Sequence, residues 1–290
     1  MTMRSEHLQS RSIELTAPDG IPLIARCFET NEPAQMTVLM LPGIGVPQRA
    51  FRHLAAWMAE RGARCLTLDY RGIGESTTQP ETVTTATLLT WARLDAVTAL
   101  EYAQQQWTEP VVLVSHSFGG QLVGLAAAFR HVHAAVFFGS QIPLGRYWDG
   151  VGRLKVELYW YLVLPLASSL FKLLPAWLGF GARLPRGVAR EWAKWGRSPE
   201  WFLSWVPDAA DTFAAMDKPI LAYAIEDDAL APPRAVTALL ELLSSAEIIR
   251  RDLTPSEIGL TKIGHVGFLK PGPIEPVWEE ALSFFNEHVS

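Results

Sequence analysis

The sequence predicts an α/β fold in which helices cover both faces of one mostly parallel sheet and a helical cap is inserted into the chain. Short, wholly apolar runs alternate with amphipathic helical patterns, which is typical of βαβ units with buried strands. The alternation stops over residues 143–212 and then resumes. A chain of 290 residues, of which 49% are hydrophobic, is long enough for one core and a sizeable insertion.

The first part of the chain predicts a hairpin followed by βαβ units. Two β-prone runs, 12–17 and 21–28, flank Pro18-Asp19-Gly20, a turn sequence that joins antiparallel strands. The pattern then predicts strands over 36–41, 64–68, 111–114 and 134–138, and helices over 48–61, 85–106 and after Ser117. Beyond the break it predicts a strand over 219–224, a helix over 235–243, a strand over 247–250 and a closing helix over 274–288.

The interruption predicts a helical cap, residues 143–212, inserted into a core made of residues 1–142 and 213–290. Its apolar run 156–174 is close to a membrane-spanning length, but charged residues and a proline interrupt it. We interpret this run as a hydrophobic cap helix over the functional site, with lipid contact or a membrane span as the alternatives. Seven of the eleven tryptophans lie in the cap and suggest an apolar surface that faces something: Trp148, Trp160, Trp177, Trp192, Trp195, Trp201 and Trp205.

Composition and charge exclude several classes of protein. The formal charge of −5 argues against a nucleic-acid binder. Cys27 and Cys65 share no ligand-like spacing with each other or with the histidines, so we expect neither a disulfide framework nor a metal site. The start of the chain has no apolar stretch typical of a signal peptide. We therefore expect a cytoplasmic protein.

The strongest chemical signal is the stretch Val-Val-Leu-Val-Ser-His-Ser-Phe-Gly-Gly over residues 111–120. It describes a strand that turns sharply into a small-residue helix, with Ser117 at the tip. Small flanking residues let strand and helix approach closely and expose the serine hydroxyl beside the helix N-terminus. Ser115 stands where this pattern prefers glycine, and it is small enough to fit. The alternative interpretation is a plain strand-to-helix turn with a capping serine.

A glycine-bearing loop after another predicted strand supplies further candidates. Leu41-Pro42-Gly43-Ile44-Gly45 follows the first parallel strand. Its Ile44 amide, together with the Phe118 amide, is suited to stabilise a developing oxyanion, because main-chain donors are fixed before the charge forms. A simple loop turn is the alternative for this segment.

The remaining candidates are a carboxylate cluster and a histidine. Glu226-Asp227-Asp228 follows a predicted strand, which places carboxylates at the carboxyl edge of the sheet, where catalytic groups collect. His265 lies in a loop between two glycines, without the apolar periodicity that surrounds a core histidine. His116 precedes Ser117, and we expect it to have a structural or pocket-wall role.

The chain resembles the α/β-hydrolase fold superfamily of the serine hydrolase or esterase type, and more narrowly a bacterial branch of predicted hydrolases. The segments PGIGVPQRAF, LDYRGIGES, VSHSFGGQ, EDDALAPP, KIGHVGF and, within the cap, LPRGVAREWAKW carry this resemblance. It implies that Ser117 is the nucleophile, His265 the general base and then acid, and Asp228 the carboxylate that orients the imidazole. Asp228 is preferred because two apolar residues and a proline follow it in DALAP; Asp227 and Glu226 remain alternatives. No metal or organic cofactor is implied.

We therefore expect a serine hydrolase that cleaves esters or thioesters with an apolar acyl or alcohol group through an acyl-enzyme. A lipase-like or acyl-transfer activity, or amide or C–C bond cleavage by the same residues, is the alternative within enzymes. The alternative from another class is a non-catalytic ligand-binding protein on a hydrolase scaffold. The expected partners are a small apolar substrate, no nucleic acid, and weak membrane or lipid contact through the cap. The sequence leaves the oligomeric state open.

Overall fold

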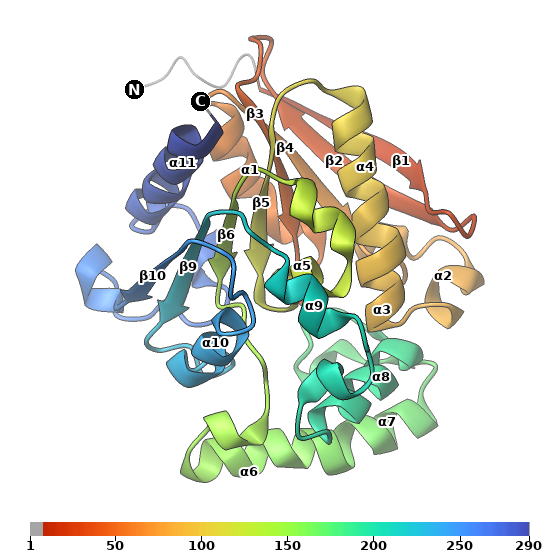
Figure 1. Ribbon diagram of the computed structural model, residues 1–290. Coiled ribbons are helices and arrows are strands. Elements are labelled where there is room, and N and C mark those ends of the chain that lie inside the picture. Colours follow the sequence, from red (N-terminus) through yellow and green to blue (C-terminus); the bar gives the residue numbers. More distant parts are fainter. Residues whose placement is uncertain (1–7, 290) are drawn as a thin grey trace.

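The computed structural model describes residues 8–289, and these form an eight-stranded sheet with helices on both faces (Figure 1). The strands are β1 (Gln9–Thr16), β2 (Pro22–Glu29), β3 (Met36–Leu41), β4 (Ala63–Asp69), β5 (Val111–His116), β6 (Ala135–Phe138), β9 (Ile220–Ile225) and β10 (Ile248–Leu253). Their order in the sheet is β1-β2-β4-β3-β5-β6-β9-β10. The pairs β1–β2 and β2–β4 are antiparallel and the others are parallel, which confirms the predicted fold class.

Helices bury both faces of this sheet. One face is covered by η1 (Gln48–Phe51), α1 (Arg52–Ala59) and α11 (Glu275–Val289). The other is covered by α3 (Leu88–Thr90), η3 (Trp91–Ala96), α4 (Val97–Gln106), η4 (Ser117–Gln121), α5 (Leu122–Leu125), η5 (Ala127–His131), α9 (Ala209–Ala214) and α10 (Pro233–Leu240). Short turns complete the core: η2 (Gly74–Ser76), α2 (Pro80–Thr84), η10 (Pro255–Ile258) and η11 (Gly267–Leu269). Because both faces are buried, the central strands are apolar along their whole length, as the sequence predicted.

Two predicted helices differ in detail from the observed ones. The helix expected over 85–106 begins at Leu88, because the Thr87 hydroxyl accepts a hydrogen bond from the Thr90 amide (3.1 Å) and caps it there. It then passes through one π-helical turn, η3, before α4. The helix expected after Ser117 begins as the 3₁₀ turn η4 and contains only a short α-helical part, α5.

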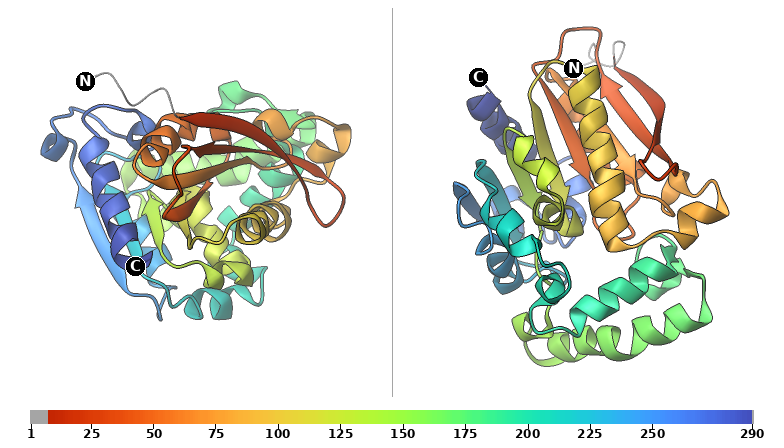
Figure 2. Two further views of the ribbon diagram at one scale, coloured as in Figure 1. Left: turned by 90° about the horizontal axis from the view of Figure 1, so that it is seen from above. Right: turned by 45° about the vertical axis from the view of Figure 1, so that its right-hand side comes forward.

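Residues 143–212, which we call the cap segment, lie between β6 and β9 at the carboxyl edge of the sheet (Figures 1 and 2). Its elements are η6 (Gly145–Tyr147), α6 (Gly150–Leu158), η7 (Tyr159–Val163), α7 (Leu164–Leu170), β7 (Leu173–Leu174), η8 (Ala176–Leu178), β8 (Leu184–Pro185), α8 (Arg186–Gly196), η9 (Trp201–Ser204) and α9. Helix α8 contacts α2 and α3 of the core and also contacts α7, so α8 forms an inner layer and α7 an outer one. The run 156–174 therefore forms the outer layer of the cap segment.

The tryptophans of the cap segment mostly pack against one another. Trp160 meets Trp192 and Trp201 with ring centroids 5.1 and 5.6 Å apart, and Trp195 meets Trp201 at 6.0 Å. Only Trp177 and Trp205 of the seven are exposed. The expectation that the tryptophans mark an apolar surface facing something therefore applies to few of them, because most build the interior of the cap segment itself.

Within residues 8–289, no helix has both the length and the apolar character needed to cross a bilayer. The expectation about the first residues of the chain concerns in part residues 1–7, which lie outside the described residues.

Candidate active site

Ser117 lies in a sharp turn between β5 and η4. Its φ of 53° is in the left-handed region, which a serine adopts only where the surrounding structure enforces it. Close packing explains the two glycines that follow: a Cβ on Gly119 would lie 2.2 Å from the Leu41 carbonyl oxygen, and one on Gly120 would lie 2.3 Å from the Ser140 hydroxyl. Ser115, at the position where the pattern prefers glycine, is fully buried. This is the strained serine turn that the sequence pattern predicted.

Asp228 and His265 are joined by a short hydrogen bond. The His265 Nδ1 lies 2.6 Å from Asp228 Oδ2. The other carboxylate oxygen accepts hydrogen bonds from the amides of Leu230 (2.9 Å) and Ala231 (3.1 Å). Asp228 is only 2% exposed, so these three hydrogen bonds fix a buried carboxylate. Because Nδ1 is occupied, Nε2 is the nitrogen of His265 that remains for proton transfer.

The neighbouring Asp227 has a different set of partners. Its Oδ2 accepts the Ile263 amide (3.0 Å) and its Oδ1 accepts the Gly264 amide (2.9 Å). Asp227 therefore fixes the backbone of the loop that carries His265, while Asp228 contacts the imidazole. Glu226, the third carboxylate of the cluster, is exposed. The two adjacent aspartates thus have different partners: Asp227 binds the backbone of the loop, and Asp228 binds the imidazole. The sequence pattern left open which of them contacts His265.

His116 supports the same loop from the nucleophile side. Its Nε2 lies 2.9 Å from the His265 carbonyl oxygen, and since a carbonyl can only accept, Nε2 carries the proton. The two rings are 4.5 Å apart. Burial, and next the proximity of His265, lower the pKa of His116 well below its ordinary value, so the ring is neutral. This contact agrees with the structural role expected for His116.

The glycine-bearing loop after β3 is fixed from two sides. The Tyr70 hydroxyl donates to the Pro42 carbonyl (3.1 Å), and the Gly45 carbonyl accepts the Ala182 amide of the cap segment (2.9 Å). Gly45 has a φ of 72°, and a Cβ there would lie 1.8 Å from the Phe180 carbonyl oxygen. The loop that carries the Ile44 amide is therefore in direct contact with the cap segment.

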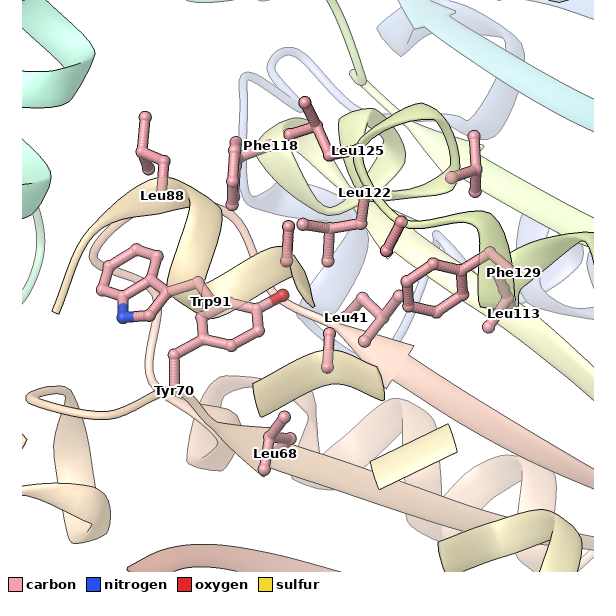
Figure 3. Packing of buried hydrophobic residues seen from close by; sticks show 14 of the residues in the cluster. Leu41, Leu68, Tyr70, Leu88, Trp91, Leu113, Phe118, Leu122, Leu125 and Phe129 are labelled. Atoms are coloured by element: carbon pink, nitrogen blue, oxygen red, sulfur yellow. The ribbon is translucent and has the colours of Figure 1, made fainter. Parts of the chain in front are cut away.

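An aromatic stack connects this loop to the serine turn. Tyr70 stacks on Trp91 at 5.0 Å, and the edge of Trp91 meets Phe118 at 6.3 Å (Figure 3). Trp91 also donates from its indole to the Arg71 carbonyl (2.9 Å). The Phe118 amide belongs to the first turn of η4, where amides have no acceptor within the helix. The contact of Tyr70 with Pro42 was not predicted from the sequence, where the LDYRGIGES segment served only to indicate the family resemblance.

The cap segment covers this edge of the sheet and leaves Ser117 only 9% exposed. Polar contacts tie the cap segment to the core. They join Glu191 to the Leu89 amide (3.0 Å), Asp208 to Arg93 (2.6 and 2.7 Å), the Trp201 indole to Gln121 (3.1 Å), the Trp148 indole to the Ala229 carbonyl (2.8 Å), and Asp149 to Arg234.

A cavity of about 580 Å³ lies beside the His265 loop, and its lining includes His265 but not Ser117. The cap segment thus encloses the serine turn, whereas the His265 loop also borders the cavity.

Comparisons with known proteins agree with this architecture. Residues 38–275 match the Alpha/beta hydrolase family. The polyketide transferase grgF of a Penicillium species is 31% identical over 136 residues, which span 46% of this chain and 46% of that protein, so the match covers about half of the relative's length.

Solved structures share the fold over nearly the whole chain. The crystal structure of the alpha/beta hydrolase GrgF from Penicillium sp. sh18 has 19% identity, a TM-score of 0.64, and coverage of 97% of this chain and 99% of that one. A thermophilic esterase from Thermogutta terrifontis has 16% identity, a TM-score of 0.60, and coverage of 97% and 100%. At these identities the similarity concerns the fold.

Proposed function

Since the chain belongs to the alpha/beta hydrolase family, we propose that it is a serine hydrolase with Ser117, His265 and Asp228 as its catalytic triad. The observation that carries the proposal is the 2.6 Å hydrogen bond from His265 Nδ1 to the buried Asp228 carboxylate, at the sheet edge that also bears the strained Ser117. A structural histidine does not need a buried carboxylate on one nitrogen, and a free Nε2 at the edge where β5 ends in Ser117 suits a general base for that serine.

In the first half of the proposed reaction, Ser117 Oγ attacks the carbonyl carbon of an ester or thioester. His265 Nε2 takes the hydroxyl proton, and Asp228 stabilises the imidazolium that forms. The Ile44 and Phe118 amides are the proposed donors to the oxyanion. Collapse of the tetrahedral intermediate breaks the bond to the leaving group, which takes the proton from His265 and departs as an alcohol or thiol.

In the second half, water attacks the acyl-enzyme. His265 removes a proton from the water, a second tetrahedral intermediate collapses, and the proton returns to Ser117 as the carboxylic acid leaves. Every proton that is taken up is returned, so the serine and the imidazole are restored after each turnover.

The proposed substrates carry an apolar acyl or alcohol group. The cap segment that covers the edge is rich in buried aromatic rings, among them Phe180, whose backbone lies against Gly45. Enclosure by such residues favours apolar groups of medium or greater length over acetyl groups. A chain-length series of p-nitrophenyl esters tests this: kcat/KM is expected to rise from acetate to octanoate, and a tenfold preference for acetate contradicts the substrate proposal.

The nucleophile is tested by intact-mass spectrometry after reaction with a fluorophosphonate, which labels activated serines. One adduct is expected on the parent protein and none on Ser117→Ala. A Ser115→Ala variant is the matched control, because Ser115 is a buried serine two residues away, and it should label like the parent. Labelling of Ser117→Ala, or an unlabelled parent in both buffer and mild detergent, contradicts the proposal.

Acyl transfer to a second substrate is the other candidate function. It is favoured by the low exposure of Ser117, since an enclosed acyl-enzyme is shielded from water, and the relative that matches about half of the chain is named a polyketide transferase. Product analysis with and without an added alcohol decides between the two: a hydrolase releases free acid in both cases, whereas a transferase forms a new ester when the alcohol is present.

A further inference from the structure

The outer helix of the cap segment exposes an apolar stripe. Elements α6, η7 and α7 follow one another from Gly150 to Leu170 and lie along the bottom of the molecule in Figure 1, beyond the carboxyl ends of the parallel strands (Figures 1 and 2). At about 1.5 Å per residue this helix is about 30 Å long. Seven apolar side chains on it are between 47% and 69% exposed: Val151, Leu154, Leu158, Tyr161, Leu162, Leu166 and Leu170. Their spacing of three or four residues places them on one face.

Two aromatic residues extend this face. Phe171 ends the helix, and Trp177, which is 76% exposed, lies in the following η8 turn. The Tyr159 hydroxyl donates to the Leu178 carbonyl (2.7 Å), which fixes that turn beside the helix. We call these nine exposed side chains, from Val151 to Trp177, the outer stripe. In residues 8–289, thirteen large hydrophobic side chains are exposed, and nine of them belong to the outer stripe, so the concentration is local.

The charge around the outer stripe is positive. The cap segment has nine Lys and Arg residues and six Asp and Glu residues, a charge of +3, whereas the rest of the chain has 16 and 24, a charge of −8. Exposed cations flank the stripe at both ends: Arg153, Lys155, Lys172 and Arg183. Glu157 is the single acidic residue from 150 to 190, and it points inward, since a Cβ on Gly145 would lie 2.1 Å from its Oε1.

The exposed apolar side chains and the flanking cations together favour one kind of partner. We propose that the outer stripe docks on the surface of an anionic lipid bilayer, with the α6–α7 helix lying in the plane of the interface. An apolar face with Lys and Arg at its flanks and exposed aromatic residues is the pattern of interfacial helices. Cations close to an anionic membrane surface are attracted to it, and each one adds to the affinity. The helix is too short and too interrupted to cross the bilayer, so it lies on the surface.

A second copy of the chain fits the outer stripe less well. Antiparallel pairing of two such helices would bring Arg153 and Lys155 of one copy near Lys172 of the other. The exposed Asp149 before the helix is already paired with Arg234, so it does not neutralise these cations. Like charges brought together at a desolvated interface oppose association. An anionic surface instead provides counter-charges for every cation of the stripe.

The outer stripe is also connected to the candidate active site. The loop that bears Trp177 continues to Ala182, whose amide donates to the Gly45 carbonyl (2.9 Å), next to Ile44. A bilayer that holds this loop would face the edge of the sheet where apolar substrates are proposed to react. This consequence rests on the proposed function, whereas the docking itself does not.

Vesicle co-sedimentation of the full chain tests the proposal. Vesicles of phosphatidylcholine with phosphatidylglycerol are compared with vesicles of phosphatidylcholine alone. We expect the parent to bind the anionic vesicles at least tenfold more tightly, with affinity falling as salt rises. A parent that binds neither kind, or both equally at all salt concentrations, overturns the proposal.

Paired variants locate the binding surface. Leu162→Glu with Leu166→Glu is expected to lower anionic-vesicle binding at least tenfold, and Lys155→Glu with Lys172→Glu by a similar factor. Ile249→Glu, at an exposed apolar residue of β10, and Arg49→Glu with Arg52→Glu, at exposed cations of the core, are the matched controls and should bind like the parent. Equal losses in test and control variants contradict docking through the stripe.

Two further measurements separate this proposal from others. Sedimentation velocity reports a second copy: a concentration-dependent dimer that Leu162→Glu with Leu166→Glu abolishes would show that the stripe is a protein interface and overturn lipid docking. Ser117→Ala should bind vesicles like the parent, since docking needs no turnover. Failure of the serine labelling experiment therefore leaves the docking proposal standing, and failure of docking leaves the proposed hydrolase standing.

Discussion

The core and the cap segment both consist largely of apolar residues, but they place them differently. Strands β3, β5 and β9 are buried at every position, and their side chains fill the two cores on either face of the sheet. In the cap segment the tryptophans of the inner layer are buried, while the outer stripe leaves apolar side chains half exposed or more. Burial of apolar area stabilises the core, but it does not account for the outer stripe. Burial thus explains the apolar residues of the core, whereas the exposed apolar residues of the outer stripe are the ones that we propose to dock on lipid.

The two regions also differ in how their geometry is fixed. In the core, Asp228 and Asp227 accept hydrogen bonds from backbone amides of neighbouring loops, and His116 Nε2 donates to the His265 carbonyl, so backbone groups fix all three side chains. The cap segment is held differently: its buried side chains join the same apolar cluster as those of the core, and side-chain pairs such as Arg93 with Asp208 add to this packing. The candidate catalytic groups are thus placed by directional backbone hydrogen bonds, whereas the cap segment is placed mainly by apolar packing.

The largest expected effect concerns the two adjacent carboxylates of the core. Asp228→Asn is expected to lower kcat about 10⁴-fold, because the amide cannot stabilise the imidazolium and favours the wrong tautomer of His265. Asp227→Asn keeps one acceptor for the loop amides and is expected to lower kcat by no more than about 100-fold. Ester hydrolysis under saturating substrate measures both.

The same pair of variants can also refute the assignment. If Asp227→Asn lost more activity than Asp228→Asn while both proteins kept the parent's circular dichroism and thermal midpoint, Asp227 would be the functional acid. If both variants lost only a little kcat, neither carboxylate would take part in the mechanism.

The second prediction compares two leucines of one cap helix. Leu164 is fully buried and Leu166 is 54% exposed, two residues further along α7. Leu164→Ala is expected to lower the free energy of unfolding by about 2–5 kcal/mol, since it leaves a cavity. Leu166→Ala should change it by less than about 0.5 kcal/mol. Urea unfolding measures both, and a loss above 1.5 kcal/mol at Leu166 would mean that this part of the outer stripe is covered within the protein.

Much of the core follows from the sequence, because its local patterns agree with the final packing. The buried strands were predictable since strands covered on both faces are apolar at every position, and the turn at Ser117 was predictable since close packing there requires small neighbours. The chain order of Ser117, Asp228 and His265 supplied the candidate site. These signals are local, and the sheet brings them to one edge.

The division of tasks between Asp227 and Asp228 was not predictable with the same ease, because it depends on the partners that residues 230, 231, 263 and 264 offer in three dimensions. The role of the cap tryptophans was also misjudged. Composition reveals that aromatic residues are concentrated, but it does not reveal whether they pack against one another or face outward. The helical spacing of the outer stripe indicates that its residues share one face. Whether that face is buried or exposed depends on which elements pack against the helix, and this is known only from the structure.

The third prediction concerns the contact between the two regions. Gly45→Ala introduces a Cβ that would lie 1.8 Å from the Phe180 carbonyl oxygen at a φ of 72°, so the cap loop must move away from the Ile44 loop. Gly259→Ala has a similar φ of 69° with nothing near the new Cβ, and it isolates the backbone cost of about 1–2 kcal/mol. Gly45→Ala is expected to lose more stability than this, together with activity. Chemical denaturation and kcat/KM measure the two losses, and equal behaviour of both variants would show that the loop contact is not maintained in solution.

The smallest expected effect is a pH dependence that belongs to the core alone, since the cap segment contains none of the seven histidines. Burial holds the pKa of His116 well below its ordinary value near 6.5, so the folded protein binds fewer protons than the unfolded chain at pH values between the two. The stability that this group contributes is therefore complete above pH 6.5 and is lost as the pH falls below it, by at most about 1.4 kcal/mol per pH unit.

His116→Gln keeps an amide that can reach the His265 carbonyl but does not titrate, so its free energy of unfolding should fall less steeply between pH 6.5 and 5.5 than that of the parent. His131→Gln, at an exposed histidine of the core, is the matched control and should keep the parent's slope. Urea unfolding at each pH gives the three slopes. If the His116→Gln slope equalled that of the parent, the ring would have to accept a proton without unfolding. Nε2 already donates to the His265 carbonyl, so the added proton would go to the buried Nδ1, which has no hydrogen-bond partner among the described residues. The core would then be more open to water at this point than its burial indicates.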